Sequence, residues 1–199
     1  MLLLFVALVL QAQPRVHVSF IGDSIVRQEK STWPDFLKDA FGKTALVVNF
    51  GVPGQRASQA VQAYDSQAHQ NRPKNGEAGW CFVHIGVNDL AAGVSPNIVY
   101  ENVKTLWAKC REDGYKVVAV TILPRVQDSQ SEARRLDLNR YIMSNPKLYD
   151  YLVRPDLKLK DAGDPSLFYD GTHPTEKGAR QLADIIAAEL KAKGVPLQR

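Results

Sequence analysis

The stretch SFIGDSIVRQ, residues 19–28, is an apolar run followed by a turn. Apolar side chains up to Ile21 are typical of a buried strand, and Gly22 and Asp23 are common turn residues. Ser24 therefore stands directly after a predicted strand. Two interpretations of Ser24 are open from this stretch alone: an ordinary turn residue, or a nucleophile held at the end of a strand.

Short apolar strands alternate with amphipathic helices along the chain. Strands are predicted at residues 16–21, 45–50, 80–85 and 116–122, with a weaker one at 151–153. Valine, isoleucine and aromatic residues are frequent in the middle strands, as in buried parallel strands. The alternation predicts an α/β fold, in which helices cover both faces of a parallel sheet.

Three helical patterns lie between or after these strands. Residues 31–42 start with Ser31 or Thr32 as a cap and end at Gly42. Residues 95–114 start at Ser95 and Pro96 and end at Gly114. The last helix is expected over about residues 175–193, before Gly194. The core-facing residues of the two longer helices are predicted from spacings of three and four: Val99, Val103, Leu106, Trp107 and Cys110, then Leu182, Ile185, Ile186 and Leu190.

Composition favours a globular protein with a real core. The chain has 199 residues, of which 45% are hydrophobic and 23% charged. The formal net charge is +4, but Lys and Arg are scattered without a run of five or six. A nucleic-acid partner is therefore not indicated, although weak attraction to anionic polymers stays open.

The N-terminus begins with nine apolar residues at positions 2–10. The run is too short to span a bilayer and fits the core of a secretory signal cleaved near Ala12. We therefore expect a signal peptide at residues 1–12, one domain at 13–199, no membrane span, and export to the periplasm or the outside. No Lys or Arg precedes the apolar run, so an N-terminal strand or a truncated start remains an alternative.

Cys81 and Cys110 are the two cysteines of the chain. Both fall on apolar sides of predicted elements, as small buried hydrophobic residues do. A disulfide is permitted in an exported protein, but two cysteines do not establish one. Two cysteines also make no zinc site.

Four polar stretches stand at the predicted carboxyl ends of strands: GDS at 22–24, NFGVPGQR at 49–56, GVNDL at 86–90 and DGTHP at 170–174. Ligands of open parallel sheets bind beyond these ends, so the four stretches should meet at one edge. There Asp170 can accept a hydrogen bond from His173, which then acts as the base that activates Ser24. The backbone N–H groups of Ser24 and Gly54 and the side-chain N–H of Asn88 can stabilise an oxyanion.

Each stretch also has a structural interpretation when taken alone. Gly54 suits an ordinary turn, Asn88 could satisfy local backbone groups, and DGTHP could be a turn before a helix. The ordered occurrence of all four at strand ends favours catalysis over four coincidences.

The blocks FIGDSIV, NFGVPG, GVNDL and DGTHP resemble those of the SGNH hydrolases, also called the GDSL esterase/lipase family. The resemblance spans residues 16 to about 193. It implies a flavodoxin-like three-layer α/β/α sandwich with a five-stranded parallel sheet, Ser24, Asp170 and His173 as catalytic triad, and Ser24, Gly54 and Asn88 as oxyanion hole. It also implies no metal and no organic cofactor.

The chain departs from the family pattern after Ser24. Ile25 replaces leucine, and Arg27 and Gln28 stand where many relatives carry a small residue and glycine, so they could alter the rim of the pocket. The G-x-S-x-G elbow of α/β-hydrolases is absent.

We expect a serine esterase that acts on short acyl groups, because the chain is short and shows no long apolar insertion that could form a lid. The DG-x-HP block and Arg56 after the second block resemble carbohydrate acetyl esterases, and Arg56 could contact a polar substrate or serve as a surface ion-pair partner. The alternatives are a broad lysophospholipase or thioesterase and, from another class, a non-catalytic binding module. The natural ester, the acyl length and the oligomeric state stay open.

Overall fold

The computed structural model describes residues 15–29, 32–74, 76–126 and 128–198. The expected signal peptide, its cleavage near Ala12 and the alternative cap Ser31 lie outside these ranges. Among the helices that the structure describes, none is long and apolar enough to cross a membrane.

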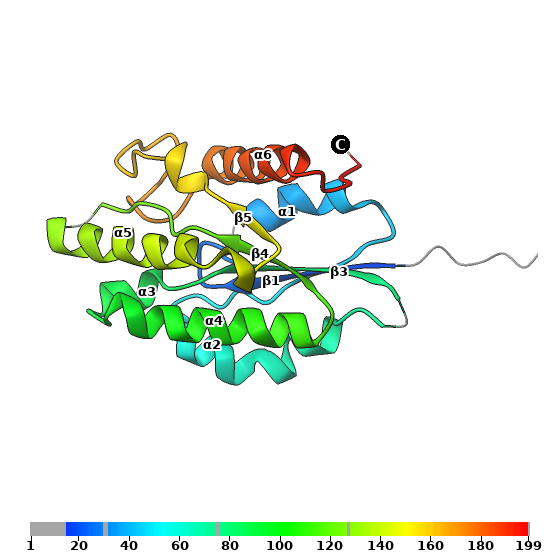
Figure 1. Cartoon of the computed structure of the whole chain (residues 1–199). Coiled ribbons are helices and arrows are strands. Elements are labelled where there is room, and N and C mark those ends of the chain that lie inside the picture. The colour runs from blue at the N-terminus through cyan, green and yellow to red at the C-terminus, as the bar shows by residue number, and fades with distance from the viewer. Residues whose placement is uncertain (1–14, 30–31, 75, 127, 199) are drawn as a thin grey trace, which may run out of the picture.

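Five parallel strands form one sheet in the order β2-β1-β3-β4-β5 (Figure 1). Their bounds are Val16–Gly22 for β1, Leu46–Asn49 for β2, Ala78–His84 for β3, Lys116–Val120 for β4 and Tyr151–Val153 for β5. In the centre, Phe20 of β1 pairs with Asn49 on one side and Phe82 on the other. All five predicted strands are confirmed, and the order is that of a flavodoxin-like sheet.

Helices cover both faces of the sheet (Figure 1). Helices α1 (Trp33–Leu37) and α6 (Glu176–Ala192) pack together on one face. Helices α2 (Ala57–Ala63) and α4 (Pro96–Glu112) lie on the other, where α3 (Val87–Ala91) and α5 (Ser129–Ser144) pack against α4. Short 3₁₀ turns stand at Lys38–Phe41, Tyr64–Ser66, Ala68–Asn71, Pro146–Leu148 and Pro155–Leu157. The three-layer α/β/α architecture is therefore confirmed.

The predicted helical stripes are buried as expected. Every core-facing residue predicted on α4 and α6 is 7% exposed or less. Thr175 caps α6, because its Oγ1 accepts the Gly178 N–H at 3.1 Å. The predicted helix at 31–42 is divided: α1 ends at Leu37 and a 3₁₀ turn continues to Phe41, which places Ala40 and Phe41 in the core.

Helix α5 was not predicted, and its buried face explains why. Arg135 and Asn139 are buried on that face, and both donate to the carbonyl oxygen of Ile122. Asn139 Oδ1 also accepts the Ile122 N–H at 2.8 Å. Polar side chains that bind the end of β4 thus interrupt the apolar stripe by which an amphipathic helix is recognised.

The core lies between the sheet and both helical layers. Trp33, Trp80 and Trp107 are all buried in it. Cys81 of β3 and Cys110 of α4 are also fully buried, and the structure joins them as a disulfide with Cα atoms 6.4 Å apart.

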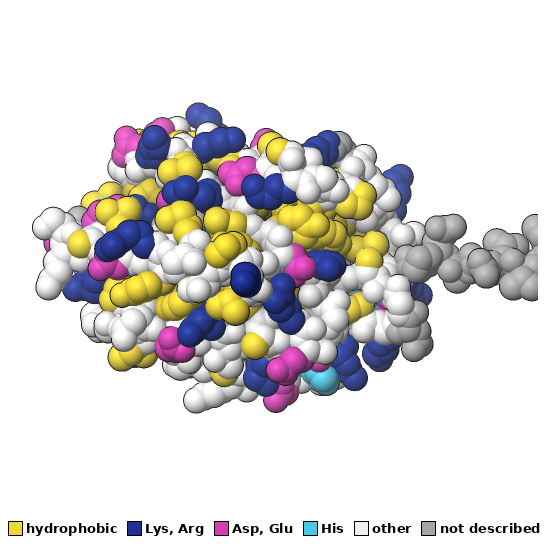
Figure 2. All heavy atoms as spheres, in the orientation of Figure 1, with side chains coloured by type: hydrophobic (Ala, Val, Ile, Leu, Met, Phe, Trp, Pro, Cys, Tyr) yellow, Lys and Arg dark blue, Asp and Glu magenta, His cyan; other side chains and the backbone are white. Residues whose placement is uncertain are grey.

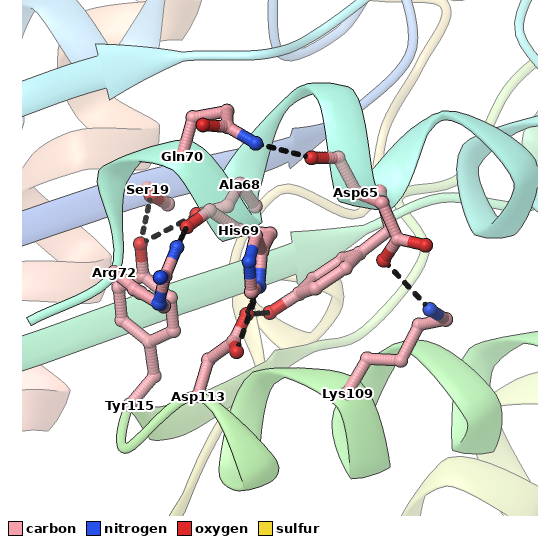
Figure 3. Close-up of polar contacts among 10 residues, drawn as sticks. Ser19, Asp65, Ala68, His69, Gln70, Arg72, Lys109, Asp113 and Tyr115 are labelled. Carbon is pink, nitrogen blue, oxygen red and sulfur yellow. Dashed lines mark hydrogen bonds and ion pairs between the residues drawn. The ribbon is translucent and has the colours of Figure 1, made fainter.

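A hydrogen-bonded group of polar residues stands at the amino end of the sheet, before β3 and β4 (Figure 3). We call Tyr64, His69 and Asp113 the amino-end cluster. The Tyr64 hydroxyl donates to Asp113 Oδ2 at 2.8 Å, and His69 Nδ1 lies 2.9 Å from Asp113 Oδ1. Nearby, the Tyr115 hydroxyl donates to the Ala68 carbonyl oxygen at 2.8 Å. These bonds tie the segment after α2 to the end of α4.

The surface shows mixed charge. Lys and Arg side chains are spread over the face drawn in Figure 2 and alternate with acidic and apolar groups. That face carries no continuous basic patch of the kind that binds nucleic acid.

Candidate active site

Ser24 lies in the turn that follows β1, at the carboxyl edge of the sheet. The turn begins at Gly22, where a Cβ atom would come within 2.2 Å of Val26 Cγ2 and 2.4 Å of the His84 carbonyl oxygen. A side chain at this position would therefore clash, and glycine is required. The chain closes the turn with the N–H groups of Val26 and Arg27, which both donate to the Asp23 carbonyl oxygen.

Ser24, His173 and Asp170 are joined in one chain of hydrogen bonds. Ser24 Oγ lies 2.8 Å from His173 Nε2, and His173 Nδ1 lies 2.6 Å from Asp170 Oδ2. The second carboxylate oxygen, Asp170 Oδ1, accepts the backbone N–H groups of Thr172 and His173. The loop between β5 and α6 thus fixes the carboxylate locally, and the carboxylate fixes the imidazole ring.

The environment of Asp170 favours its charged form. Partial burial pulls the pKa of Asp170 upward, but the hydrogen bonds from His173 and Thr172 outweigh it and hold the pKa below its usual range. An ionised Asp170 keeps the proton of His173 on Nδ1 and leaves Nε2 to accept from Ser24.

Gly54 and Asn88 come from two other loops at the same edge. Gly54 has φ +76°, and a Cβ atom added there would meet nothing within 4 Å, so this position is open to an approaching ligand. Asn88 Nδ2 donates to the Gln55 carbonyl oxygen at 3.1 Å. An amide nitrogen carries two hydrogens, so this bond orients the group and leaves its other N–H for a ligand.

Buried carboxyl groups underlie these loops. Asp89 Oδ2 accepts the Ala57 N–H at 2.9 Å and so ties the loop of Gly54 to α3. Asp23 Oδ1 accepts the Ile25 N–H at 3.0 Å, whereas its Oδ2 has no partner among the described residues. Burial, with a smaller contribution from Asp89, raises the pKa of Asp23 to about 7.

A cavity of about 390 Å³ opens at Ser24 and His173. Gln28, Glu29, Pro53 and Tyr169 line the rest of it. Gln28 was expected at the rim, whereas Tyr169 was not singled out, although it directly precedes DGTHP. A second cavity borders Gly54 and also touches Pro53.

Arg56 is exposed at the start of α2, and its backbone N–H donates to Gln59 Oε1 at 2.9 Å. Neither cavity has Arg56 among its described lining residues. Within the described ranges, no group of three or more His, Cys, Asp or Glu side chains is placed to hold a metal ion.

Comparison with known protein families supports the assignment of an active site at this edge of the sheet. Residues 20–181 match the model of the GDSL-like lipase/acylhydrolase family, and the chain belongs to that family. It is accordingly a carboxylic ester hydrolase.

Individual relatives are distant in sequence. A Bacillus subtilis protein named as a probable rhamnogalacturonan acetylesterase is 23% identical, over 91% of this chain and 95% of that one. A GDSL-like lipase structure from Bacteroides thetaiotaomicron is 22% identical with a TM-score of 0.68, over 90% of this chain and 87% of that one. The psychrotrophic esterase EstA of Pseudoalteromonas is 18% identical with a TM-score of 0.68, over 88% and 97%. The two structures show the same fold.

Proposed function

We propose that this hydrolase is a serine esterase that removes short acyl groups, acetyl above all, through Ser24, His173 and Asp170. The observation that carries the proposal is the continuous hydrogen-bonded chain from Asp170 through His173 to Ser24, whose hydroxyl borders a cavity. A serine hydroxyl is a weak nucleophile until an adjacent base takes its proton, and His173 is that base.

The reaction has two halves. Ser24 Oγ attacks the ester carbonyl carbon while its proton passes to His173 Nε2, and the bond from carbon to the alcohol oxygen then breaks as His173 gives that proton to the alcohol. In the second half a water molecule attacks the acyl-enzyme, His173 takes one of its protons, and Ser24 regains a proton as the carboxylic acid leaves. Asp170 stabilises the imidazolium form of His173 in both halves.

The negative charge on the carbonyl oxygen needs donors that are fixed before the reaction begins. We assign the backbone N–H groups of Ser24 and Gly54 and the side-chain N–H of Asn88 to this role. The bond from Asn88 to the Gln55 carbonyl oxygen supports the assignment, because it holds the amide beside the Gly54 loop.

Acetyl preference rests on two observations. The sequence shows no long apolar insertion that could form a lid over a long acyl chain. In addition, the Bacillus subtilis relative carries the name of an acetylesterase. Arg56 is proposed to contact polar substrate beyond the Gly54 loop.

The nucleophile is tested by Ser24→Ala. Loss of a triad nucleophile reduces kcat by about 10⁶, so turnover of p-nitrophenyl acetate should fall to background. The thermal unfolding temperature should stay that of the wild type, since Ser24 is a partly exposed turn residue. A variant that kept more than a few per cent of wild-type turnover would rule out Ser24 as nucleophile.

The acyl length is tested with p-nitrophenyl esters from acetate to dodecanoate. A deep apolar pocket would add about 0.8 kcal/mol of binding for each buried methylene. We expect no such gain, and kcat/KM should be highest for acetate or butyrate and decline by octanoate. A maximum at octanoate or beyond would instead support the lysophospholipase or thioesterase alternative and leave the triad untouched.

A further inference from the structure

Four residues of the cavity at Ser24 have no part in the chemistry derived above: Gln28, Glu29, Pro53 and Tyr169. Two of them lie beside His173: the Tyr169 ring stacks on its imidazole, and Gln28 accepts the Tyr169 hydroxyl. Because His173 gives its proton to the departing alcohol, the alcohol oxygen must lie within hydrogen-bond distance of Nε2. The remainder of the alcohol then extends over these neighbours.

Tyr169 offers this side of the cavity a fixed aromatic surface. Its ring stacks on that of His173, with centroids 5.6 Å apart and an interplanar angle of 16°. The hydroxyl donates to Gln28 Oε1 at 2.9 Å, and Gln28 Nε2 donates in turn to the Pro174 carbonyl oxygen at 3.3 Å. Although it is held at both ends, Tyr169 is still 51% exposed.

The chemistry of the lining matches a sugar ring better than a hydrocarbon chain. A sugar ring presents C–H groups on its faces and hydroxyl groups around its edge. The Tyr169 ring can pack against the C–H groups, while the Glu29 carboxylate and the Gln28 amide can take the hydroxyl groups. A hydrocarbon chain in the same place would desolvate both polar side chains without replacing their hydrogen bonds to water.

We propose that Tyr169, Gln28 and Glu29 form a subsite for the alcohol part of the ester, and that this alcohol is a carbohydrate ring. The proposal rests on the proposed function, since it takes His173 as the group that protonates the alcohol. It assigns Tyr169 a role in specificity and none in the chemical step.

The test compares two acetyl esters that differ in the alcohol alone: a mono-O-acetylated methyl xyloside and ethyl acetate. In the wild type, kcat/KM should be higher for the xyloside. Tyr169→Ala should lower kcat/KM for the xyloside about five- to tenfold, the size expected from one lost ring contact, and change kcat/KM for ethyl acetate less than twofold.

Two further variants serve as controls. Tyr169→Phe, which keeps the ring, should retain most of the preference for the xyloside. Tyr141→Ala removes an exposed tyrosine that stacks on Tyr100 of α4, and it should change neither rate.

Two results would overturn the subsite. An equal loss on both esters in Tyr169→Ala would mean that Tyr169 acts by holding His173, and a wild type without preference for the xyloside would mean that no sugar is recognised. Both results would leave the esterase mechanism standing. A wild type inactive on both acetyl esters and on p-nitrophenyl acetate would instead refute the proposed function, and the subsite with it.

Discussion

A histidine is hydrogen-bonded to an aspartate at each end of the sheet. At the amino end, His69 Nδ1 lies 2.9 Å from Asp113 Oδ1, and at the carboxyl end, His173 Nδ1 lies 2.6 Å from Asp170 Oδ2. The hydroxyl group is placed differently in the two. Tyr64 donates its hydroxyl to the carboxylate of Asp113, whereas Ser24 Oγ contacts His173 Nε2.

The difference shows what turns a histidine–aspartate pair into a site. In the amino-end cluster both neighbours converge on the carboxylate, so the bonds hold two chain segments together and activate no hydroxyl. Burial and the bond to Asp113 also raise the pKa of Tyr64 above its ordinary value, which keeps the phenol protonated. At the carboxyl end the same groups form a line that ends on a hydroxyl beside a cavity.

The sharpest comparison exchanges the aspartate of each pair for asparagine. Asp170→Asn should reduce kcat roughly 10³- to 10⁴-fold, because an amide neither holds the required tautomer of His173 nor stabilises its imidazolium form. Asp113→Asn should leave kcat unchanged and lower the free energy of unfolding by roughly 1 to 3 kcal/mol, the effect of weakening a partly buried group of hydrogen bonds. Steady-state kinetics and urea unfolding of both variants measure this.

The contrast between the two ends would fail in either of two ways. The first is an Asp170→Asn variant that retains a tenth or more of wild-type kcat, and the second is an Asp113→Asn variant that loses activity while still folded. The first would remove Asp170 from the mechanism, and the second would give the amino-end cluster a catalytic role.

The asparagines at the two ends provide the next comparison. Asn88→Ala should reduce kcat by roughly 10² to 10³ with little change in KM, because an oxyanion donor acts mainly in the transition state. Asn71, at the amino end, donates to the Val18 carbonyl oxygen and to Ser19 Oγ, so Asn71→Ala should affect stability and not kcat. A loss in Asn88→Ala confined to KM would make Asn88 a residue that binds the ground state.

Local sequence signals predicted the pairing of Asp170 with His173 and all five strands. Asp170 and His173 are three residues apart, and Asp170 also accepts backbone N–H groups within the same loop, so a short motif contains the whole pair. The parallel sheet follows from alternating elements, and its flavodoxin-like arrangement was implied by the family resemblance. The strands and the Asp170–His173 pair could be predicted because each is determined mainly by residues within one short stretch of sequence.

Features that depend on individual side-chain contacts between distant residues were not predicted, whereas the approach of Ser24 and His173 at one edge of the sheet was. Helix α5 was not predicted because Arg135 and Asn139 face inward, where both donate to the carbonyl oxygen of Ile122, 13 and 17 positions away. Tyr169 was not identified as a site residue because its place in the site depends on two contacts: its ring stacks on His173, and its hydroxyl donates to Gln28, 141 positions away. The disulfide also needs the packing of α4 on β3, which no spacing of two cysteines reveals.

The last comparison concerns one carboxyl group from each end of the sheet, partly buried Asp113 and fully buried Asp23. Asp113 has hydrogen-bond donors at both oxygens, whereas Asp23, fully buried beside Ser24, lacks a described partner for Oδ2. Because desolvation raises the pKa of Asp23 to about 7, the folded protein keeps a proton there that the unfolded chain, with a pKa of about 3.9, has released by pH 5. The folded state binds more protons in this window, so the contribution of Asp23 to stability falls as the pH rises from about 4 to 7 and then levels off.

Asp23→Asn removes this titration while its amide oxygen can still accept the Ile25 N–H. Relative to the wild type, the variant should therefore gain roughly 2 to 3 kcal/mol of unfolding free energy between pH 5 and pH 8. Urea unfolding of both proteins at the two pH values gives this number, and the comparison cancels every group that the proteins share. The direction is the decisive point, because a carboxyl stabilised in its charged form would give the opposite sign. A stability difference between the variant and the wild type that is the same at both pH values would show that Asp23 does not titrate in this range.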